Sequence, residues 1–162
     1  MRHEARQVPS WLIFDVSQER STTMEMSTYL NFQGHCEKAF KFYERCLGAQ
    51  IGQIFRYAGS PMADQVPAGW QGKVMHGSLT IGSQVLMGAD IVAEKYEAPK
   101  GFSLSLQFKS TTEAERVFYA LVEGGKVVMP LEKTFWAERF GMLVDRLGIP
   151  WMINCEGAGS PS

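Results

Sequence analysis

The stretch YLNFQGHCEKAFKFYERCLGAQI, Tyr29 to Ile51, decides the fold, because the chain carries a similar stretch a second time. Shifted from position 29 to position 105 without a gap, it falls on SLQFKSTTEAERVFYALVEGGKV. The identical residues in this register are Leu30, Phe32, Glu37, Phe42, Tyr43 and Gly48, which meet Leu106, Phe108, Glu113, Phe118, Tyr119 and Gly124. Agreement spread over strand, helix and helix end indicates an internal duplication.

The first copy predicts a βαβββ unit. A strand at 27–32 precedes an amphipathic helix at 36–47, which Gly48 ends. A strand at 49–57 follows, and after a loop rich in Pro and Gly the segments VMHGSLTIG and SQVLMGAD predict a hairpin. The apolar face expected for the helix consists of Cys36, Ala39, Phe40, Tyr43 and Leu47.

The second copy predicts the same unit. GFSLSLQF alternates strictly, and Ser110 and Glu113 match a capping box at the start of a helix. Gly124 and Gly125 end that helix, and KVVMP, RFGMLVD and PWMINC supply three further strands. The expected apolar helix positions are Ala114, Val117, Phe118, Leu121 and Val122. The fold class is therefore α+β, with two βαβββ repeats around a central cleft.

These elements divide the chain into modules. We expect a first module at 26–90, a linker at 91–100, a second module at 101–156 and a tail at 157–162. Residues 1–25 differ in composition from the rest, and Met24 and Met26 both stand just before the first strand. We therefore expect 1–25 to be a disordered extension or the product of an over-long start site.

Composition excludes several classes of protein. The 162 residues carry a formal net charge of -1 and no basic run, which argues against a nucleic-acid partner. The three cysteines show no CxxC spacing, so neither a zinc site nor a disulfide framework is expected, and a reducing cytoplasm is the simplest location. No apolar run is long enough for a membrane span. Open sheet edges lead us to expect a homodimer.

Alternation along the strands predicts which side chains line the cleft. A four-stranded sheet with one helix buries only one face, so two copies can form a cleft with their free faces. If Phe102, Leu104, Leu106 and Phe108 meet the helix, Ser103 and Ser105 face the cleft, and the duplicate register adds Tyr29 and Asn31. In the third strand, Met75, Leu79 and Ile81 on the helix side leave His76 on the polar side.

Three motifs carry a family resemblance. They are the opening NFxGxCExAFxFYxxxLGA, the strand MHGSLTIG and the closing run TFWAERFGMLVDRLGIPWMINC. Together with the paired βαβββ plan, they resemble the PhnB-like branch of the vicinal oxygen chelate superfamily, over about 26–156. That superfamily includes glyoxalase I, extradiol dioxygenases, and fosfomycin and bleomycin resistance proteins, so the resemblance does not choose one reaction.

The resemblance implies a divalent metal held by His and Glu from the first and fourth strands of each half. The matching positions here differ: STYLNF contains no His or Glu, the fifth strand offers Ser103 and Ser105, and the fourth and eighth strands offer Met87 and Met152. We therefore expect neither the usual metal site nor another cofactor. A divalent metal held by nonstandard ligands such as His76 and Glu138 stays as the alternative.

Two places carry the remaining candidate chemistry. His76 is expected to be catalytic, because an imidazole can act as acid, base or ligand near neutral pH, although a neighbour could simply satisfy it. In TFWAERFG, Glu138 is the second catalytic candidate, and Trp136 and Arg139 are expected to bind ligand. Alternation places Glu138 on the side of Phe140 and Arg139 on the opposite side. A Glu–Arg surface pair beside a packed Trp is the competing interpretation.

Three functions remain open on the sequence. The first is a small-molecule-binding protein of the PhnB-like type, whose organic ligand lies between the repeats. The second is a metal-dependent lyase, isomerase or dioxygenase with nonstandard ligands, and the third is a non-catalytic sequestering protein of the resistance type. No GxGxxG or doubly wound pattern is present, so a methyltransferase is not expected.

Overall fold

A computed structural model describes residues 24–157, so the predictions for the N-terminal extension and the tail fall almost wholly outside the described residues. The first module contains β1 (Thr28–Phe32), α1 (Cys36–Leu47), β2 (Gln50–Arg56), β3 (Val74–Ile81) and β4 (Gln84–Asp90). The second contains β5 (Leu104–Phe108), α2 (Thr111–Val122), β6 (Lys126–Glu132), β7 (Arg139–Val144) and β8 (Pro150–Cys155). Short 3-10 turns occur at Ala63–Gln65, Ala68–Trp70 and Ala93–Lys95. The predicted pair of βαβββ units is confirmed.

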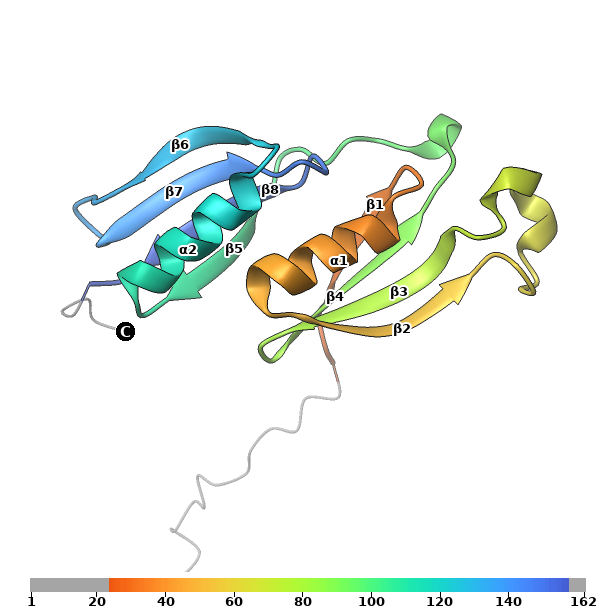
Figure 1. Ribbon diagram of the computed structural model, residues 1–162, viewed down its shortest axis with the longest axis horizontal. Helices are drawn as coiled ribbons and strands as arrows, with labels where there is room; N and C mark the ends of the chain where they lie inside the picture. The colour runs from red at the N-terminus through yellow and green to blue at the C-terminus, as the bar shows by residue number, and fades with distance from the viewer. Residues whose placement is uncertain (1–23, 158–162) are drawn as a thin grey trace, which may run out of the picture.

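The strands form two four-stranded mixed sheets, in the orders β1-β4-β3-β2 and β5-β8-β7-β6. In each sheet the first strand pairs in parallel with the last strand of its module, and the other pairs are antiparallel. Figure 1 shows each helix covering one face of its own sheet, with α1 and α2 side by side and β2 and β6 at the outer ends. The opposite face of each sheet carries no helix. Neither α1 nor α2 is long and apolar enough to cross a membrane, and the other described segments contain no helix that is.

The duplication holds in the structure, but its register shifts inside the helix. Strands β1 and β5 start at 28 and 104, and β2 and β6 at 50 and 126, as the ungapped alignment requires. The helices start at 36 and 111, one residue short of that spacing. Tyr43 is therefore equivalent to Phe118, and both are buried, whereas Tyr119 is 64% exposed. The alignment of Tyr43 with Tyr119 was wrong, because a shorter loop before α2 is compensated by a longer loop after it.

Alternation gave most of the strand faces correctly. Leu30 and Phe32 are buried in the core, and Leu104, Leu106 and Phe108 pack against it. Phe102 was expected on the same side, but it lies before β5 and is 46% exposed. A residue outside the hydrogen-bonded ladder has no pleat to fix the direction of its side chain.

The first residues of β3 also depart from the prediction. Val74 is buried there, whereas Met75, which we expected on the helix side, is only half-buried. Phe55 pairs with His76, but Arg56 pairs with Val74, so one residue of β3 is left without a partner. Such a bulge turns the flanking residues to new faces, and this is why simple alternation fails at Met75.

The two modules meet at their helices. Phe42 and Cys46 lie in the buried set although neither belongs to the predicted face of α1. The Cys46 thiol donates to the backbone oxygen of Ala120 in α2 over 3.5 Å, and the Arg146 guanidinium lies 4.7 Å from the centre of the Phe42 ring. The second module therefore buries a face of α1 that one isolated repeat would expose.

Ser110 caps α2 as the sequence predicts, and its removal has a measurable cost. The Ser110 hydroxyl accepts a hydrogen bond from the backbone N–H of Glu113 over 3.4 Å, while the Glu113 carboxylate pairs with Arg116. We expect Ser110→Ala to lower the free energy of unfolding by about 0.5–1 kcal/mol, because one amide at the helix start loses its acceptor. Urea denaturation followed by circular dichroism measures this loss. Thr112→Ala, an exposed change in the same turn, should cause none, and equal losses in both variants would contradict the capping role.

Candidate functional site

Three aromatic rings lie in a row on the helix-free face of the first sheet. The Tyr29 hydroxyl and His76 Nδ1 are 3.0 Å apart. The rings of Tyr29 and His76 stack with centroids 5.6 Å apart at 28°, and those of Phe55 and His76 lie 6.3 Å apart at 27°. The imidazole is thus held between two near-parallel aromatic rings. We call Tyr29, His76 and Phe55 the ring row.

A bulge in β2 places Phe55 in the ring row. Ile51 pairs with Leu79, but Ile54 pairs with Gly77, so an extra residue of β2 lies between these pairs. The Cβ that Gly77 lacks would meet the Phe40 ring of α1, which shows that the Gly77–Ile54 pair faces the helix. Phe55, one residue further, therefore points to the open face with His76. Counting alternate residues from Ile51 puts Phe55 on the wrong side, and this explains why sequence reasoning missed it.

The Tyr29 phenol stays protonated at neutral pH. Partial burial raises the pKa of Tyr29 above its ordinary value, and the nearby Cys36 and Tyr57 add smaller effects in the same direction. The phenol can donate its proton to Nδ1, which places the proton of a neutral imidazole on Nε2. In the other tautomer, Nδ1–H donates to the phenol oxygen and Nε2 becomes an acceptor. One imidazole nitrogen is therefore occupied by Tyr29 in both tautomers, and Nε2 remains for a ligand.

Two pockets, which we call the seam pockets, lie beside β1, one against the connection between the modules and one between the modules themselves. One, of about 390 Å³, contains Tyr29 and Asn31 from β1 together with Lys100 and Phe102 from the connection between modules. The other, of about 300 Å³, contains Ser103 and Ser105. Its remaining lining residues are Met26, Ser27, Thr28, Ile81, Gln84, Val85, Leu86, Leu104 and Trp151. The structure thus brings four of the predicted ligand residues to these seam pockets.

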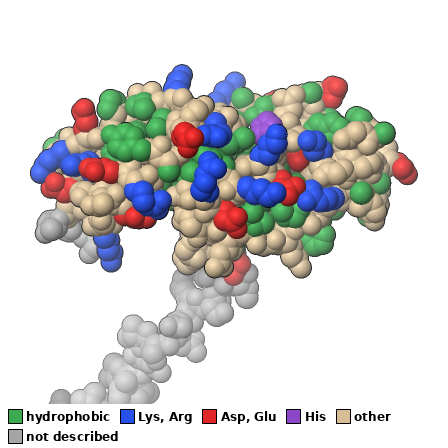
Figure 2. Space-filling model, viewed as in Figure 1, with side chains coloured by type: hydrophobic (Ala, Val, Ile, Leu, Met, Phe, Trp, Pro, Cys, Tyr) green, Lys and Arg blue, Asp and Glu red, His purple; other side chains and the backbone are tan. Residues whose placement is uncertain are grey.

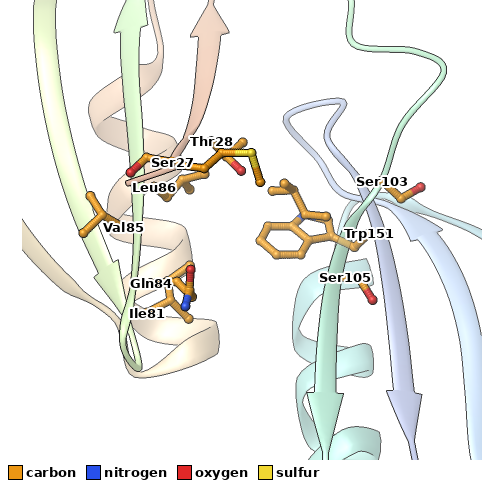
Figure 3. Close-up of a pocket in the computed structure, with 11 residues that line it drawn as sticks. Ser27, Thr28, Ile81, Gln84, Val85, Leu86, Ser103, Ser105 and Trp151 are labelled. Carbon is orange, nitrogen blue, oxygen red and sulfur yellow. The ribbon is translucent and has the colours of Figure 1, made fainter. Parts of the chain in front are cut away.

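Figure 3 shows that the second of these pockets is built from both modules. Ser27, Thr28, Val85 and Leu86 come from the side of β1 and β4, and the Trp151 indole points toward them from the second module. Trp151 is 1% exposed, and its indole N–H donates to the Asp145 carboxylate over 2.8 Å. Its position is therefore fixed, and it forms a rigid wall of the seam. Sequence reasoning assigned Trp151 no role, because a buried Trp in a strand normally only packs.

The other candidate residues lie elsewhere. Trp136 packs on the Phe140 ring with centroids 5.4 Å apart, before β7 at the outer part of the second sheet. The Glu138 carboxylate binds the Lys133 ammonium at 3.0 Å, and the Arg139 guanidinium binds Glu115 of α2 at 2.8 Å. Arg139 therefore lies on the helix side, opposite Phe140. His76 lies in β3 of the first sheet, whereas Glu138 precedes β7 of the second sheet and is paired with Lys133.

The donors present do not fit the divalent metal that the superfamily implies. Between residues 24 and 157, no group of three His, Cys, Asp or Glu side chains converges on one point. The cross-strand neighbours at the expected ligand positions are Tyr29 beside Met87, and Ser105 beside Met152. A phenol, a hydroxyl and two thioethers are poor ligands for Mn²⁺, Fe²⁺, Ni²⁺ or Zn²⁺. No chemical step is therefore derived through such a metal.

Comparison with known proteins agrees with this architecture. The family model described as Glyoxalase/Bleomycin resistance protein/Dioxygenase superfamily matches residues 28–153. Protein YjdN of Escherichia coli is 33% identical over 139 residues, which cover 81% of this chain and 95% of YjdN. The chain therefore belongs to the glyoxalase, bleomycin resistance protein and dioxygenase superfamily.

Two solved structures place it more closely. Protein PA1353 from Pseudomonas aeruginosa is 45% identical with a TM-score of 0.75, covering 83% of this chain and 98% of that one. A PhnB protein from Bacillus cereus is 28% identical with a TM-score of 0.70, covering 82% and 99%. These relatives support the PhnB-like branch within the superfamily.

Proposed function

We propose that the protein binds a small organic ligand with a planar group against the ring row, between the two repeats. The stacking of His76 between Tyr29 and Phe55, with Nε2 left for a ligand, is the observation that supports this proposal. Aromatic faces bind planar groups by offset stacking, and the imidazole can give or accept a hydrogen bond at the edge of the ligand. Tyr29 and Phe55 are 46% and 48% exposed, so both rings remain accessible.

The neighbouring seam pocket extends this surface. Tyr29 belongs both to the ring row and to the pocket of about 390 Å³, where Asn31 and Lys100 also lie. An amide and an ammonium beside an aromatic platform suit a ligand with a carbonyl or an anionic group, and Glu97 of the same lining can accept a hydrogen bond from a donor on that ligand. The proposed ligand is thus a planar ring system with one polar or acidic substituent. Trp136, Glu138 and Arg139, at the other end of the second sheet, are not part of this site.

A fragment screen tests the proposal. Monocyclic aromatic compounds with and without a carboxylate are titrated into the ¹⁵N-labelled protein, and amide and imidazole shifts are recorded. We expect shifts at Tyr29, Phe55 and His76, larger for the carboxylates, and a loss of affinity of at least about tenfold in His76→Ala, because the hydrogen bond at Nε2 and the ring between Tyr29 and Phe55 are both removed. His35→Ala, which changes the other described histidine, serves as the control. Fragments that shift only residues around Trp136 would contradict the proposed site.

The same variant separates binding from catalysis. Tyr29 OH and His76 form a hydrogen-bonded acid–base pair, which can move a proton to or from a bound ligand. If the protein is an enzyme, His76→Ala should abolish turnover of the ligand. Tyr29→Phe should still bind that ligand. If it is a sequestering protein, both variants should change only affinity. The alternative of a metal held by His76 and Glu138 gains no support, because no three potential ligands converge within residues 24–157 and the Glu138 carboxylate pairs with Lys133.

We further propose that the protein is a homodimer. Exposed apolar residues of the second module include Val127 and Val128 of the edge strand β6, and Phe135 and Trp136 of the segment after it. Exposed apolar patches mark interaction sites more often than isolated apolar residues do. Light scattering coupled to size exclusion should give twice the chain mass of 18.1 kDa. A mass of one chain at all concentrations would refute the dimer.

A further inference from the structure

Three methionines lie side by side on the second sheet, away from the ring row. Met129 of β6 pairs with Met142 of β7, and Met142 pairs with Met152 of β8. Directly opposite residues of antiparallel strands point to the same face, and neighbouring strands lie about 4.8 Å apart. The three side chains therefore form one continuous line across β6, β7 and β8. We call them the methionine row.

The methionine row lies on the face without a helix. On β7, the Cβ that Gly141 lacks would meet the Phe118 ring of α2 at 2.8 Å, and Leu143 is 1% exposed, so these two residues face the helix. Met142 between them must face the other way. On β8, Trp151 and Ile153 are buried and Met152 lies between them. Met129 is 43% exposed, so the row is accessible.

A bulge in β6 brings the third methionine into line. Val127 pairs with Leu143, and in a regular antiparallel ladder the next residue, Val128, would then pair with Met142. Met129 takes that place instead, because the register shifts by one residue between these pairs. Bulges commonly re-aim a side chain in this way. The alignment of three thioethers thus depends on a specific irregularity of the strand.

From this arrangement we infer a binding site for a soft monovalent cation, Cu(I) or its surrogate Ag(I), held by the thioethers of Met129, Met142 and Met152. Thioether sulfur is a soft, uncharged ligand that prefers such ions over hard divalent ones. A methionine side chain has three rotatable bonds, so the outer two can bend toward an ion above Met142. The neighbours of Met142 and Met152 on the same face include Phe140, Val144 and Pro150, and the carboxylate of Glu132 lies further along the ladder, opposite Phe140.

This site is separate from the proposed ligand site in residues, sheet and chemistry. Of its three ligands, only Met152 occupies a position where the superfamily holds its divalent metal. The site needs no imidazole or carboxylate. The inference therefore stands or falls independently of the function proposed for the ring row.

Silver titration of the full chain tests the inference. Ag(I) is added as its nitrate, in chloride-free buffer, to protein labelled with ¹³C at the methionine methyl groups. We expect the methyl signals of Met129, Met142 and Met152 to shift together and to saturate at one ion per chain, while those of Met62, Met75 and Met87 stay in place. Met142→Leu should weaken binding by at least about tenfold, since the central ligand of three is lost. Met62→Leu, an exposed methionine in a loop, should leave binding unchanged.

Cysteine binding is the competing explanation, and the methyl signals distinguish it. Cys36, Cys46 and Cys155 are all buried, and burial raises the pKa of each thiol, so the thiolate that binds silver best is disfavoured. Silver that binds without shifting the three methyl signals, or that binds Met142→Leu as tightly as the parent, would overturn the inference.

Discussion

Replacing Asp145 by alanine is expected to lower the free energy of unfolding by about 3–5 kcal/mol, the range typical of removing one member of a buried charged network. Asp145 is 3% exposed, and its two carboxylate oxygens accept four hydrogen bonds. The Tyr43 hydroxyl donates over 2.7 Å and the Trp151 indole N–H over 2.8 Å. The backbone N–H groups of Leu147 and Ile149 donate over 2.8 and 3.0 Å.

The loss is large because Asp145 joins the two modules. Tyr43 belongs to α1 of the first module, whereas Trp151 belongs to β8 of the second. Without the carboxylate, three buried donors and the part-buried Leu147 N–H are left without an acceptor, and each buried one costs about 1–3 kcal/mol when it is unsatisfied, less what relaxation recovers. Total stability of a domain is only about 5–15 kcal/mol, so this change removes a large part of it.

Urea unfolding followed by circular dichroism and by tryptophan fluorescence measures the effect. Asp64→Ala, at an exposed position in a 3-10 turn, is the matched control and should change stability by no more than about 0.5 kcal/mol. Tyr43→Phe removes a single donor and should cost about 1.5–3 kcal/mol, as for one hydrogen bond to a charged group. A loss below 1 kcal/mol in Asp145→Ala would show that the carboxylate does not hold the modules together.

The sequence predicted the fold well because its signals are local. The repeat of 29–51 at 105–127, the amphipathic helices and the glycines after them all depend on residues close together in the chain. Gly48 and Gly124 were expected to end the helices, and both adopt a left-handed backbone, with φ of 64° and 74°. Side chains other than glycine rarely adopt that conformation, so these positions could be recognised from residue type alone.

The candidate site was harder to predict, because bulges and contacts between modules determine it. Asn31, Ser103 and Ser105 lie in the seam pockets, where alternation from unbroken strands could point to them. Phe55 and Met129 depend on register shifts in β2 and β6 that no sequence pattern showed. The expectation that Glu138 accompanies His76 came from residue types, which carry no information on the distance between two sheets.

Gly125→Ala is expected to destabilise the protein by at least about 3 kcal/mol, beyond the usual cost of overpacking, because backbone atoms rather than a side chain block the added methyl group. A Cβ on Gly125 would lie 2.9 Å from the Cα and the carbonyl carbon of Asp145, and closer still to the Val144 oxygen. The equivalent residue of the first repeat is Ala49, which is buried without such a clash. The second repeat therefore requires glycine where the first does not.

Gly69→Ala is the matched control for Gly125→Ala. Nothing lies within 4 Å of the Cβ that Gly69 lacks, and its φ is not positive, so this change should be neutral or slightly stabilising through the unfolded chain. Thermal and urea unfolding of both variants give the comparison. Equal stability of Gly125→Ala and Gly69→Ala would show that β6 can move away from the β7–β8 turn. A selective loss in Gly125→Ala would show that the close approach at Asp145, which also anchors Tyr43 and Trp151, leaves the second module no room to adjust.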